Sequence, residues 1–182
     1  MILGPMFAGK STELMRRMRR HKLANLQCII IKYEKDLRHG EGLDKLATHD
    51  NHRVAAVPCS RLYDLFKEAS SMDVIGIDEA QFYPDLVAFC EELAEMGKII
   101  ILSALDGDFR REPFGAVTSL VPKAESIIKL TAVCKLCHQE ASFTRRTTAD
   151  VALEAIGGEE MYMPTCRKCF RAPLPSRETG GE

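Results

Sequence analysis

The chain has 182 residues, a formal net charge of −1, 46% hydrophobic residues and 28% charged residues. These values are ordinary for a globular domain, and no apolar stretch approaches the roughly 20 residues that cross a bilayer. The sequence therefore argues against a disordered or membrane-spanning protein. The near-neutral charge also argues against a dedicated nucleic-acid binder, which would depend on a cationic surface.

The N-terminal segment carries a phosphate-binding motif between a strand that ends at Leu3 and a helix predicted from Ser11 to about Leu26. The segment Gly4-Pro5-Met6-Phe7-Ala8-Gly9-Lys10-Ser11 fits the pattern G-x-x-x-x-G-K-[ST]. In this pattern backbone N–H groups face phosphate oxygens, the lysine charge lies at the β/γ-phosphates, and the hydroxyl reaches Mg²⁺. The context disfavours a glycine-rich turn with an incidental lysine. Because three residues are short for the first strand, we expect further residues upstream in the native protein.

Apolar strands and helices alternate through the middle of the chain. Continuous apolar strands of this kind form parallel sheets with helices on both faces. The polar stretch from Tyr33 to Arg53 is predicted to be a mobile loop. Strands are predicted at 28–32, 54–57, 74–77, 99–102 and 126–130, and helices at 62–69 and 86–93, the latter closed by Gly97.

Two adjacent carboxylates, Asp78 and Glu79, follow the predicted strand 74–77. Because strands of a parallel sheet end at one edge, we expect Asp78 to be the second magnesium ligand of the phosphate site. Glu79 is placed to orient or deprotonate an attacking hydroxyl or water, or to support the metal indirectly. The residues alone separate neither a kinase from an ATPase nor one nucleotide from another, but no N-K-x-D element for guanine is present, which favours ATP.

Seven cysteines are unevenly distributed. Two C-x-x-C pairs offer four thiolates, a complete tetrahedral set for structural Zn²⁺. Redox or disulfide pairs are the alternative, which we disfavour because neither C-x-x-C is expected to open a helix after a strand; His138 is a possible replacement ligand. An odd cysteine count favours a reducing, cytoplasmic compartment, with the single cysteines as small buried hydrophobes. The pairs are Cys134 with Cys137 and Cys166 with Cys169, and the singles are Cys28, Cys59 and Cys90.

Charged and aromatic residues add weaker indications. The basic run from Arg16 to Lys22 is more often a solvated or subunit-facing helix side than a nucleic-acid patch. A loop arginine such as Arg38 can close over phosphates. Phe82, Phe109 and Phe114 each follow a strand end, and residue type alone favours the core over a ligand pocket for them.

Several motifs occur in order between Ile2 and Cys169, and together they resemble the cytosolic (type II) thymidine kinases. This series is highly specific to that family. The motifs are Gly4 to Ser11, Val74-Ile75-Gly76-Ile77-Asp78-Glu79-Ala80-Gln81-Phe82, Ala104-Leu105-Asp106-Gly107-Asp108-Phe109, Pro113-Phe114-Gly115, Lys129-Leu130-Thr131-Ala132-Val133-Cys134 and the second C-x-x-C.

The resemblance implies an α/β P-loop (RecA-like) fold whose active site transfers the γ-phosphate of ATP to the 5′-hydroxyl of thymidine. It assigns Glu79 as the general base and places Lys10 and Arg38 at the transferred phosphoryl group. Ser11 and Asp78 would hold Mg²⁺, and ATP would contact Gly4, Pro5, Phe7, Ala8, Gly9, Lys10, Ser11, Thr12 and Asp78.

The resemblance also implies how the nucleoside is held. The long stretch between the zinc-binding pairs, 28 residues, would fold over thymidine as a lasso anchored by zinc at both ends. Backbone groups of the lasso would bind the base, Tyr162 the sugar, and Thr144 would lie near the thymine methyl. The pocket would be formed by Met6, Phe82, Leu105, Phe109, Phe114, Thr144, Leu153, Ala155, Ile156, Gly157 and Tyr162.

The family is homotetrameric and is inhibited by dTTP, the triphosphate of its own product, and we expect both properties here. We expect three parts: a kinase domain at 1–132, a zinc and lasso module at 133–170, and a disordered tail at 171–182. Asp108 and Ala155 depart from some members, which have threonine and a bulkier residue there, and the loop 38–50 is longer than in some members. The alternative function is a nucleic-acid-stimulated P-loop ATPase with a structural zinc module.

Overall fold

A six-stranded parallel sheet forms the centre of the protein in the computed structural model, which describes residues 1–36, 45–47, 53–148, 151–153 and 157–173. The strand order is β5-β2-β6-β7-β1-β8, and every neighbouring pair is parallel. The parallel order aligns the carboxyl ends of the strands at one edge, where ligands of such sheets bind. The strands are β1 (Ile2–Leu3), β2 (Cys28–Tyr33), β5 (Val57–Cys59), β6 (Val74–Ile77), β7 (Ile99–Ala104) and β8 (Ile128–Lys129).

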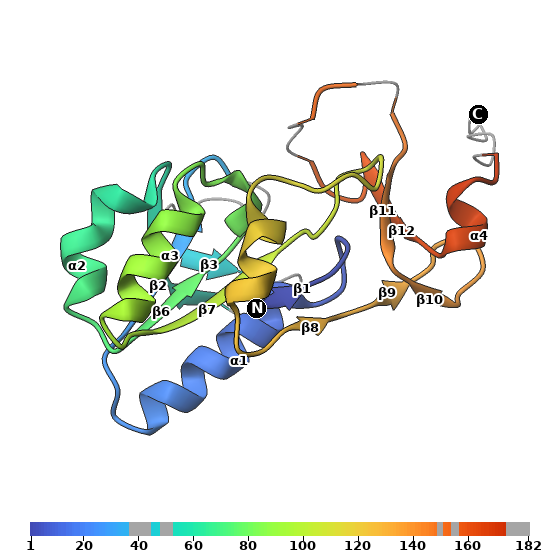
Figure 1. Cartoon of the computed structure of the whole chain (residues 1–182). Helices are drawn as coiled ribbons and strands as arrows, with labels where there is room; N and C mark the ends of the chain where they lie inside the picture. The colour runs from blue at the N-terminus through green and yellow to red at the C-terminus, as the bar shows by residue number, and fades with distance from the viewer. Residues whose placement is uncertain (37–44, 48–52, 149–150, 154–156, 174–182) are drawn as a thin grey trace.

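Helices cover both faces of this sheet (Figure 1). On one face, α1 (Lys10–Leu23) packs Leu14 and Met18 against sheet residues such as Val74. On the other face, α3 (Leu86–Glu95) buries Phe89 and Leu93, together with η1 (Leu62–Leu65), α2 (Phe66–Ser70) and η3 (Val117–Lys123). The predicted α/β fold with helices on both faces is confirmed. Within the described residues, no helix is long and apolar enough to span a membrane.

A smaller module of short strands follows the sheet and lies beside it in Figure 1. β9 (Ala132–Val133) pairs antiparallel with β10 (Glu140–Ala141), and β11 (Phe143–Arg146) pairs antiparallel with β12 (Tyr162–Thr165). The helix α4 (Arg167–Phe170) ends it. The expectation that neither C-x-x-C opens a helix after a strand was wrong, because Cys166 follows β12 and caps α4 through its Sγ. A four-residue helix is too short to leave a periodic pattern in the sequence.

Short elements account for the other differences from the sequence prediction. The predicted loop 33–53 contains β3 (Lys45–Ala47), which pairs antiparallel with β4 (Arg53–Ala55). The single strand predicted at 54–57 is therefore divided between β4 and β5. Strands of three residues carry too little alternation to be distinguished from a loop. Residues 37–44 and 48–52 of the predicted loop and most of the predicted tail, 174–182, lie outside the described residues, whereas Tyr33 is the last residue of β2.

Candidate active site

The loop between β1 and α1 has the shape that the phosphate-binding motif predicts. Gly4 has φ 144°, and a Cβ atom there would lie 2.5 Å from the carbonyl oxygen of Leu130. Only glycine fits both the backbone angle and this close approach. Lys10, at the start of α1, donates from Nζ to the carbonyl of Pro5 at 2.7 Å, so its ammonium group lies across the loop. The lysine ammonium group therefore lies at the same loop whose backbone N–H groups would face a phosphate.

A hydroxyl and a carboxylate meet directly behind this loop. Ser11 Oγ lies 3.1 and 3.0 Å from the two carboxylate oxygens of Asp78, which is 3% exposed at the end of β6. Ser103, on the neighbouring strand β7, also donates to Asp78. A serine hydroxyl at the end of the phosphate loop and a carboxylate at the end of another strand are the oxygen donors that hold Mg²⁺ in P-loop proteins. The residues present therefore fit a magnesium ion.

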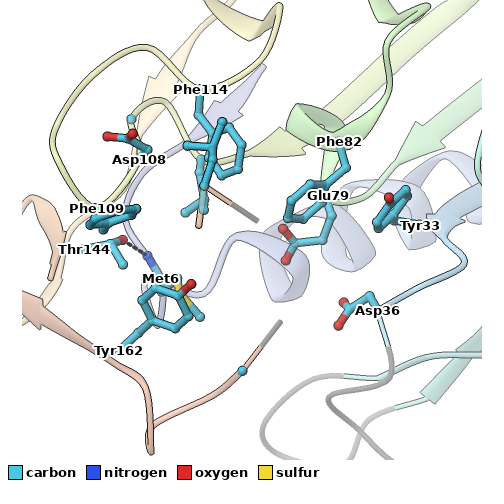
Figure 2. A pocket seen from close by; sticks show the side chains of 14 residues that line it. Met6, Tyr33, Asp36, Glu79, Phe82, Asp108, Phe109, Phe114, Thr144 and Tyr162 are labelled. Atoms are coloured by element: carbon cyan, nitrogen blue, oxygen red, sulfur yellow. Dashed lines mark hydrogen bonds between the residues drawn. The ribbon is translucent and has the colours of Figure 1, made fainter. Parts of the chain in front are cut away.

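Glu79 is adjacent to Asp78 but points elsewhere. Its backbone is left-handed, with φ 52° and ψ 43°, and it precedes the 3-10 helix η2 (Ala80–Phe82). The Gln81 amide Nε2 donates to Glu79, while Gln81 Oε1 accepts the backbone N–H of Leu105 at 3.0 Å. Gln81 thus fixes the carboxylate of Glu79 to the end of β7. Figure 2 shows this carboxylate facing the pocket beside Phe82.

The pocket next to Glu79 has mainly apolar walls and encloses about 540 Å³, counting the open space at its mouth. The carboxyl ends of the sheet strands bound it on one side, and β11 and β12 of the module bound it on the other (Figure 2). Phe82, Phe109 and Phe114 lie on its wall, although residue type alone favoured the core for them. The lining residues that the sequence singled out are Met6, Glu79, Phe82, Leu105, Phe109, Phe114, Thr144, Leu153, Gly157 and Tyr162.

Three residues named from the sequence cannot be placed. Arg38, Ala155 and Ile156 lie outside the described residues. The structure does add lining residues that the sequence reasoning missed: Tyr33, Asp36, Gly107 and Asp108. Tyr33 ends β2, and its ring stacks on Phe82 with centroids 4.8 Å apart and an interplanar angle of 19°. The rule that ligands lie at strand ends would have found Tyr33.

Asp108, one of the departures noted from the family resemblance, shapes the loop after β7. Its Oδ1 accepts the backbone N–H groups of Arg110 at 2.8 Å and Glu112 at 2.9 Å. These two bonds turn the chain tightly between Gly107 and Pro113, which form an isolated antiparallel bridge. Asp108 therefore supports the wall that carries Phe109.

The module is tied directly to the phosphate loop. Thr144 Oγ1, on β11, accepts the backbone N–H of Met6 at 2.9 Å, and Thr144 is 4% exposed (Figure 2). Because Met6 lies inside the phosphate-binding motif, this hydrogen bond fixes one wall of the pocket relative to the phosphate site. The arrangement brings the phosphate loop, the Ser11–Asp78 pair and the Glu79 carboxylate to the mouth of an aromatic pocket.

The four paired cysteines form one cluster. Their Sγ atoms all lie within 4.8 Å of one another, and those of Cys137 and Cys166 are 3.6 Å apart. A tetrahedral site with Zn–S bonds of ~2.3 Å has S···S edges of about 3.8 Å, so the cluster could hold zinc. Burial raises the pKa of the Cys134 thiol, but hydrogen bonds from the backbone N–H groups of Cys166, Leu136 and Cys137 outweigh burial and lower it to about 6. These bonds favour the thiolate form of Cys134 that a metal requires, whereas hydrogen bonds with the side chains of Cys137 and Cys166 raise the pKa of Cys169 to about 12.

The fold and this site define a P-loop nucleotide-binding protein with a second, apolar pocket beside the phosphate loop. The family model "Thymidine kinase" matches residues 1–170, and the chain belongs to this family. It is 50% identical to the thymidine kinase of raccoon poxvirus over 170 residues, 93% of this chain and 94% of the relative. It is 52% identical to the cytosolic thymidine kinase of Homo sapiens, covering 93% of this chain and 71% of the relative. It is 51% identical to thymidine kinase 1 of Dictyostelium discoideum, covering 94% and 76%.

Proposed function

We propose that this protein transfers the γ-phosphate of ATP to the 5′-hydroxyl of thymidine and so produces thymidine monophosphate. The observation that supports this most is the position of Glu79. The residue follows Asp78 at the end of β6, and it also lines the aromatic pocket. A nucleoside in that pocket would place its hydroxyl between Glu79 and the phosphate loop. Family membership supports thymidine as the nucleoside.

The phosphate end of the site would hold Mg-ATP. The backbone of residues 4–12 would contact the phosphates, and Lys10 would exchange its bond to the Pro5 carbonyl for the β/γ-phosphates. Ser11 and Asp78 would hold Mg²⁺, which supplies positive charge at the phosphates when it is bound. We assign Arg38 to the transferred phosphoryl group on the resemblance alone.

Glu79 would accept the proton of the 5′-hydroxyl as the oxygen attacks the γ-phosphorus and the bond to ADP breaks. Its placement suits a general base, because Gln81 donates a hydrogen bond to one carboxylate oxygen and the Glu79 side chain lines the pocket. Gln81 also fixes Glu79 relative to Leu105, which lines the same pocket. A base held in this way loses little freedom when the substrate binds.

The aromatic pocket would hold the thymidine. Phe82, Phe109 and Phe114 offer flat apolar surfaces that suit a pyrimidine base, and Thr144 would lie near its methyl group. We propose that Tyr162 contacts the sugar and that backbone groups from Leu153 to Gly157 bind the edge of the base. Within the latter range, Leu153 and Gly157 line the pocket, and Ala155 and Ile156 are assigned from the resemblance.

We propose that zinc, held by the four cysteines, anchors both ends of the lasso between Cys137 and Cys166 and has a structural role. In this organisation residues 1–132 bind ATP, 133–170 cover the nucleoside and 171–182 form a tail. We further propose a cytoplasmic homotetramer that is inhibited by dTTP. No nucleic-acid partner is proposed, because the net charge of the chain is −1 and two cations of the basic run, Arg16 and Arg17, pair with Glu13 at 2.6 and 2.8 Å.

The test is the release of ADP from Mg-ATP by the purified protein with thymidine, deoxyuridine, deoxycytidine or deoxyguanosine. We expect release that depends on thymidine and is saturable, with little release in the absence of a nucleoside. Turnover that requires single-stranded DNA or RNA and ignores thymidine would instead establish the nucleic-acid-stimulated ATPase. A steep loss of that turnover with added salt would identify phosphate contacts as its cause.

A further inference from the structure

Arg146, the last residue of β11, has an unusual set of contacts. Its guanidinium group donates to the carbonyl oxygens of Ala152 and, at 3.3 Å, Leu153, and to the hydroxyl of Tyr162 at 2.6 Å. The guanidinium carbon lies 3.8 Å from the centroid of the Phe109 ring. Arg146 is only 7% exposed, so nearly the whole side chain is surrounded by these groups.

Three of these partners line the pocket, whereas Arg146 itself is not a lining residue. Leu153 belongs to the connection between β11 and β12, Tyr162 begins β12, and Phe109 belongs to the loop after β7. One planar side chain therefore joins three separate segments of the pocket wall. A guanidinium group can do this because it combines several donors in a fixed plane with a face that stacks on aromatic rings.

We infer that Arg146 is a positioning residue for the nucleoside: it sets the places of Phe109, Tyr162 and the lasso backbone at residues 152–153 before a nucleoside binds. The neighbouring contact supports this role, because Arg110 donates to the carbonyl of Val151 at 2.8 Å. Two arginines thus hold three successive lasso carbonyls. A wall ordered in advance lowers the ordering cost of binding, so Arg146 acts on affinity for the nucleoside.

The contacts of Arg146 lie on the nucleoside side of the site. The groups that would act in phosphoryl transfer have other partners. Glu79 is bonded to Gln81, and Lys10 to the carbonyl of Pro5. Asp78 accepts hydrogen bonds from Ser11 and Ser103. Removing the guanidinium group should therefore raise KM for thymidine and leave kcat and KM for ATP nearly unchanged. A lysine cannot replace it, because an ammonium group lacks the planar fork and the stacking face.

The test, which rests on the proposed function, compares Arg146→Lys and Arg146→Met with Arg145→Lys as the matched control. Arg145 is the preceding residue of β11 and donates to the carbonyl of Cys169, in the cysteine cluster. We expect KM for thymidine to rise about tenfold or more in both Arg146 variants, with kcat within about twofold, and no such rise in the control. Zinc content and melting temperature are measured for every variant.

A second readout does not depend on activity. Glu154 follows Leu153 in the sequence, so glutamyl endopeptidase reports how well this part of the lasso is held. Without nucleoside, both Arg146 variants should be cut after Glu154 several times faster than the wild type and the Arg145 control. The cut sites are identified by mass spectrometry.

The outcomes separate the two proposals. A wild-type protein without thymidine-dependent turnover would refute the proposed function, and the proteolysis comparison would still decide whether Arg146 holds the lasso. An active wild type with unchanged thymidine KM and unchanged cutting in both Arg146 variants would refute only the positioning role. Equal losses of kcat and of thymidine affinity, with lost zinc, would also refute it, because they would show a general structural role.

Discussion

Asp78 and Glu79 are neighbours in sequence, yet their side chains serve different parts of the site. Asp78 is nearly fully buried and receives two serine hydroxyls, whereas Glu79 turns to the pocket through a left-handed backbone. A non-glycine residue in this conformation costs roughly 1–2 kcal/mol, which the surrounding structure must offset. The strained turn separates a carboxylate suited to a metal from one suited to a substrate hydroxyl.

At the residue scale, Glu79→Gln tests this separation. The glutamine amide is nearly isosteric with the carboxylate and can still form hydrogen bonds, but it cannot accept a proton. We therefore expect kcat to fall at least ~10²-fold while Mg-ATP affinity is retained. Steady-state kinetics and equilibrium ATP binding provide the measurements. Glu91→Gln is the control, since Glu91 pairs with Lys123 on the surface and should leave kcat unchanged. A Glu79→Gln enzyme with near-normal kcat would show that Glu79 is not the base.

The residues that could be named from the sequence without the family resemblance are those whose roles follow from local spacing. Lys10, Ser11 and Asp78 are identifiable because the motif and the strand end fix their surroundings within a few positions. Gln81 and Arg146 were missed, since their roles depend on partners brought together by folding. Gln81 acts through Leu105, and Arg146 through Phe109 and Tyr162. A glutamine or an arginine alone gives no indication of such a partner.

At the scale of elements, the helix η2 and the loop after β7 are packed in direct backbone contact. A Cβ atom on Gly115 would lie 2.3 Å from the carbonyl oxygen of Gln81, and the backbone of Gly115 has φ 59°. This contact holds the turn that carries Glu79 and Gln81 against the segment that carries Phe114. The position of Glu79 therefore depends on the absence of a side chain at residue 115.

Replacing Gly115 by alanine should lower the stability of the fold and weaken nucleoside binding. Gly97→Ala is the matched control, because Gly97 also has positive φ, 77°, but has open space where its Cβ would lie. We expect Gly97→Ala to cost about 1 kcal/mol from backbone strain alone, and Gly115→Ala to cost ~1–3 kcal/mol more from the clash. Denaturant unfolding measures both, and thymidine KM should rise only in Gly115→Ala. Equal stability losses would contradict the packing account.

Among the elements, the long strands and the helices α1 and α3 were predictable from the sequence. Their apolar residues form continuous runs in the strands and recur at helical spacing in the helices. The short elements were not: β3, β4 and α4 have three or four residues each, which is less than a useful pattern length. The capping of α4 by Cys166 was also hidden, although its cysteine spacing was plain. The C-x-x-C spacing predicted that the four cysteines would come together, but it did not predict the local structure around them.

At the scale of the whole molecule, the pocket exists only because two parts of the chain meet. The sheet and the loops that follow its strands supply Glu79 and the phenylalanine rings, and the module supplies Thr144, Leu153, Gly157 and Tyr162. Both ends of the lasso stretch emerge from the cysteine cluster. Zinc removal should therefore affect the nucleoside half of the site more than the phosphate half.

In metal-free protein, we expect thymidine KM to rise at least about tenfold and Mg-ATP binding to be affected less, because the proposed zinc site would contribute its folding energy mainly to the module. Zinc is removed with a chelator, its absence is verified by elemental analysis, and kinetics are measured before and after zinc is restored. Unchanged kinetics in verified metal-free protein would refute the coupling between the cysteine cluster and the lasso.

Phosphoryl transfer to the 5′-oxygen of thymidine is tested most directly by identifying the product. The protein is incubated with γ-labelled Mg-ATP and either thymidine or 5′-deoxythymidine, which lacks the attacking hydroxyl. We predict that all transferred label appears in thymidine 5′-monophosphate, one per ADP released, and that 5′-deoxythymidine competes with thymidine but gives no labelled product. Label released as inorganic phosphate at the same rate with both compounds would contradict the account, because water would then be the acceptor.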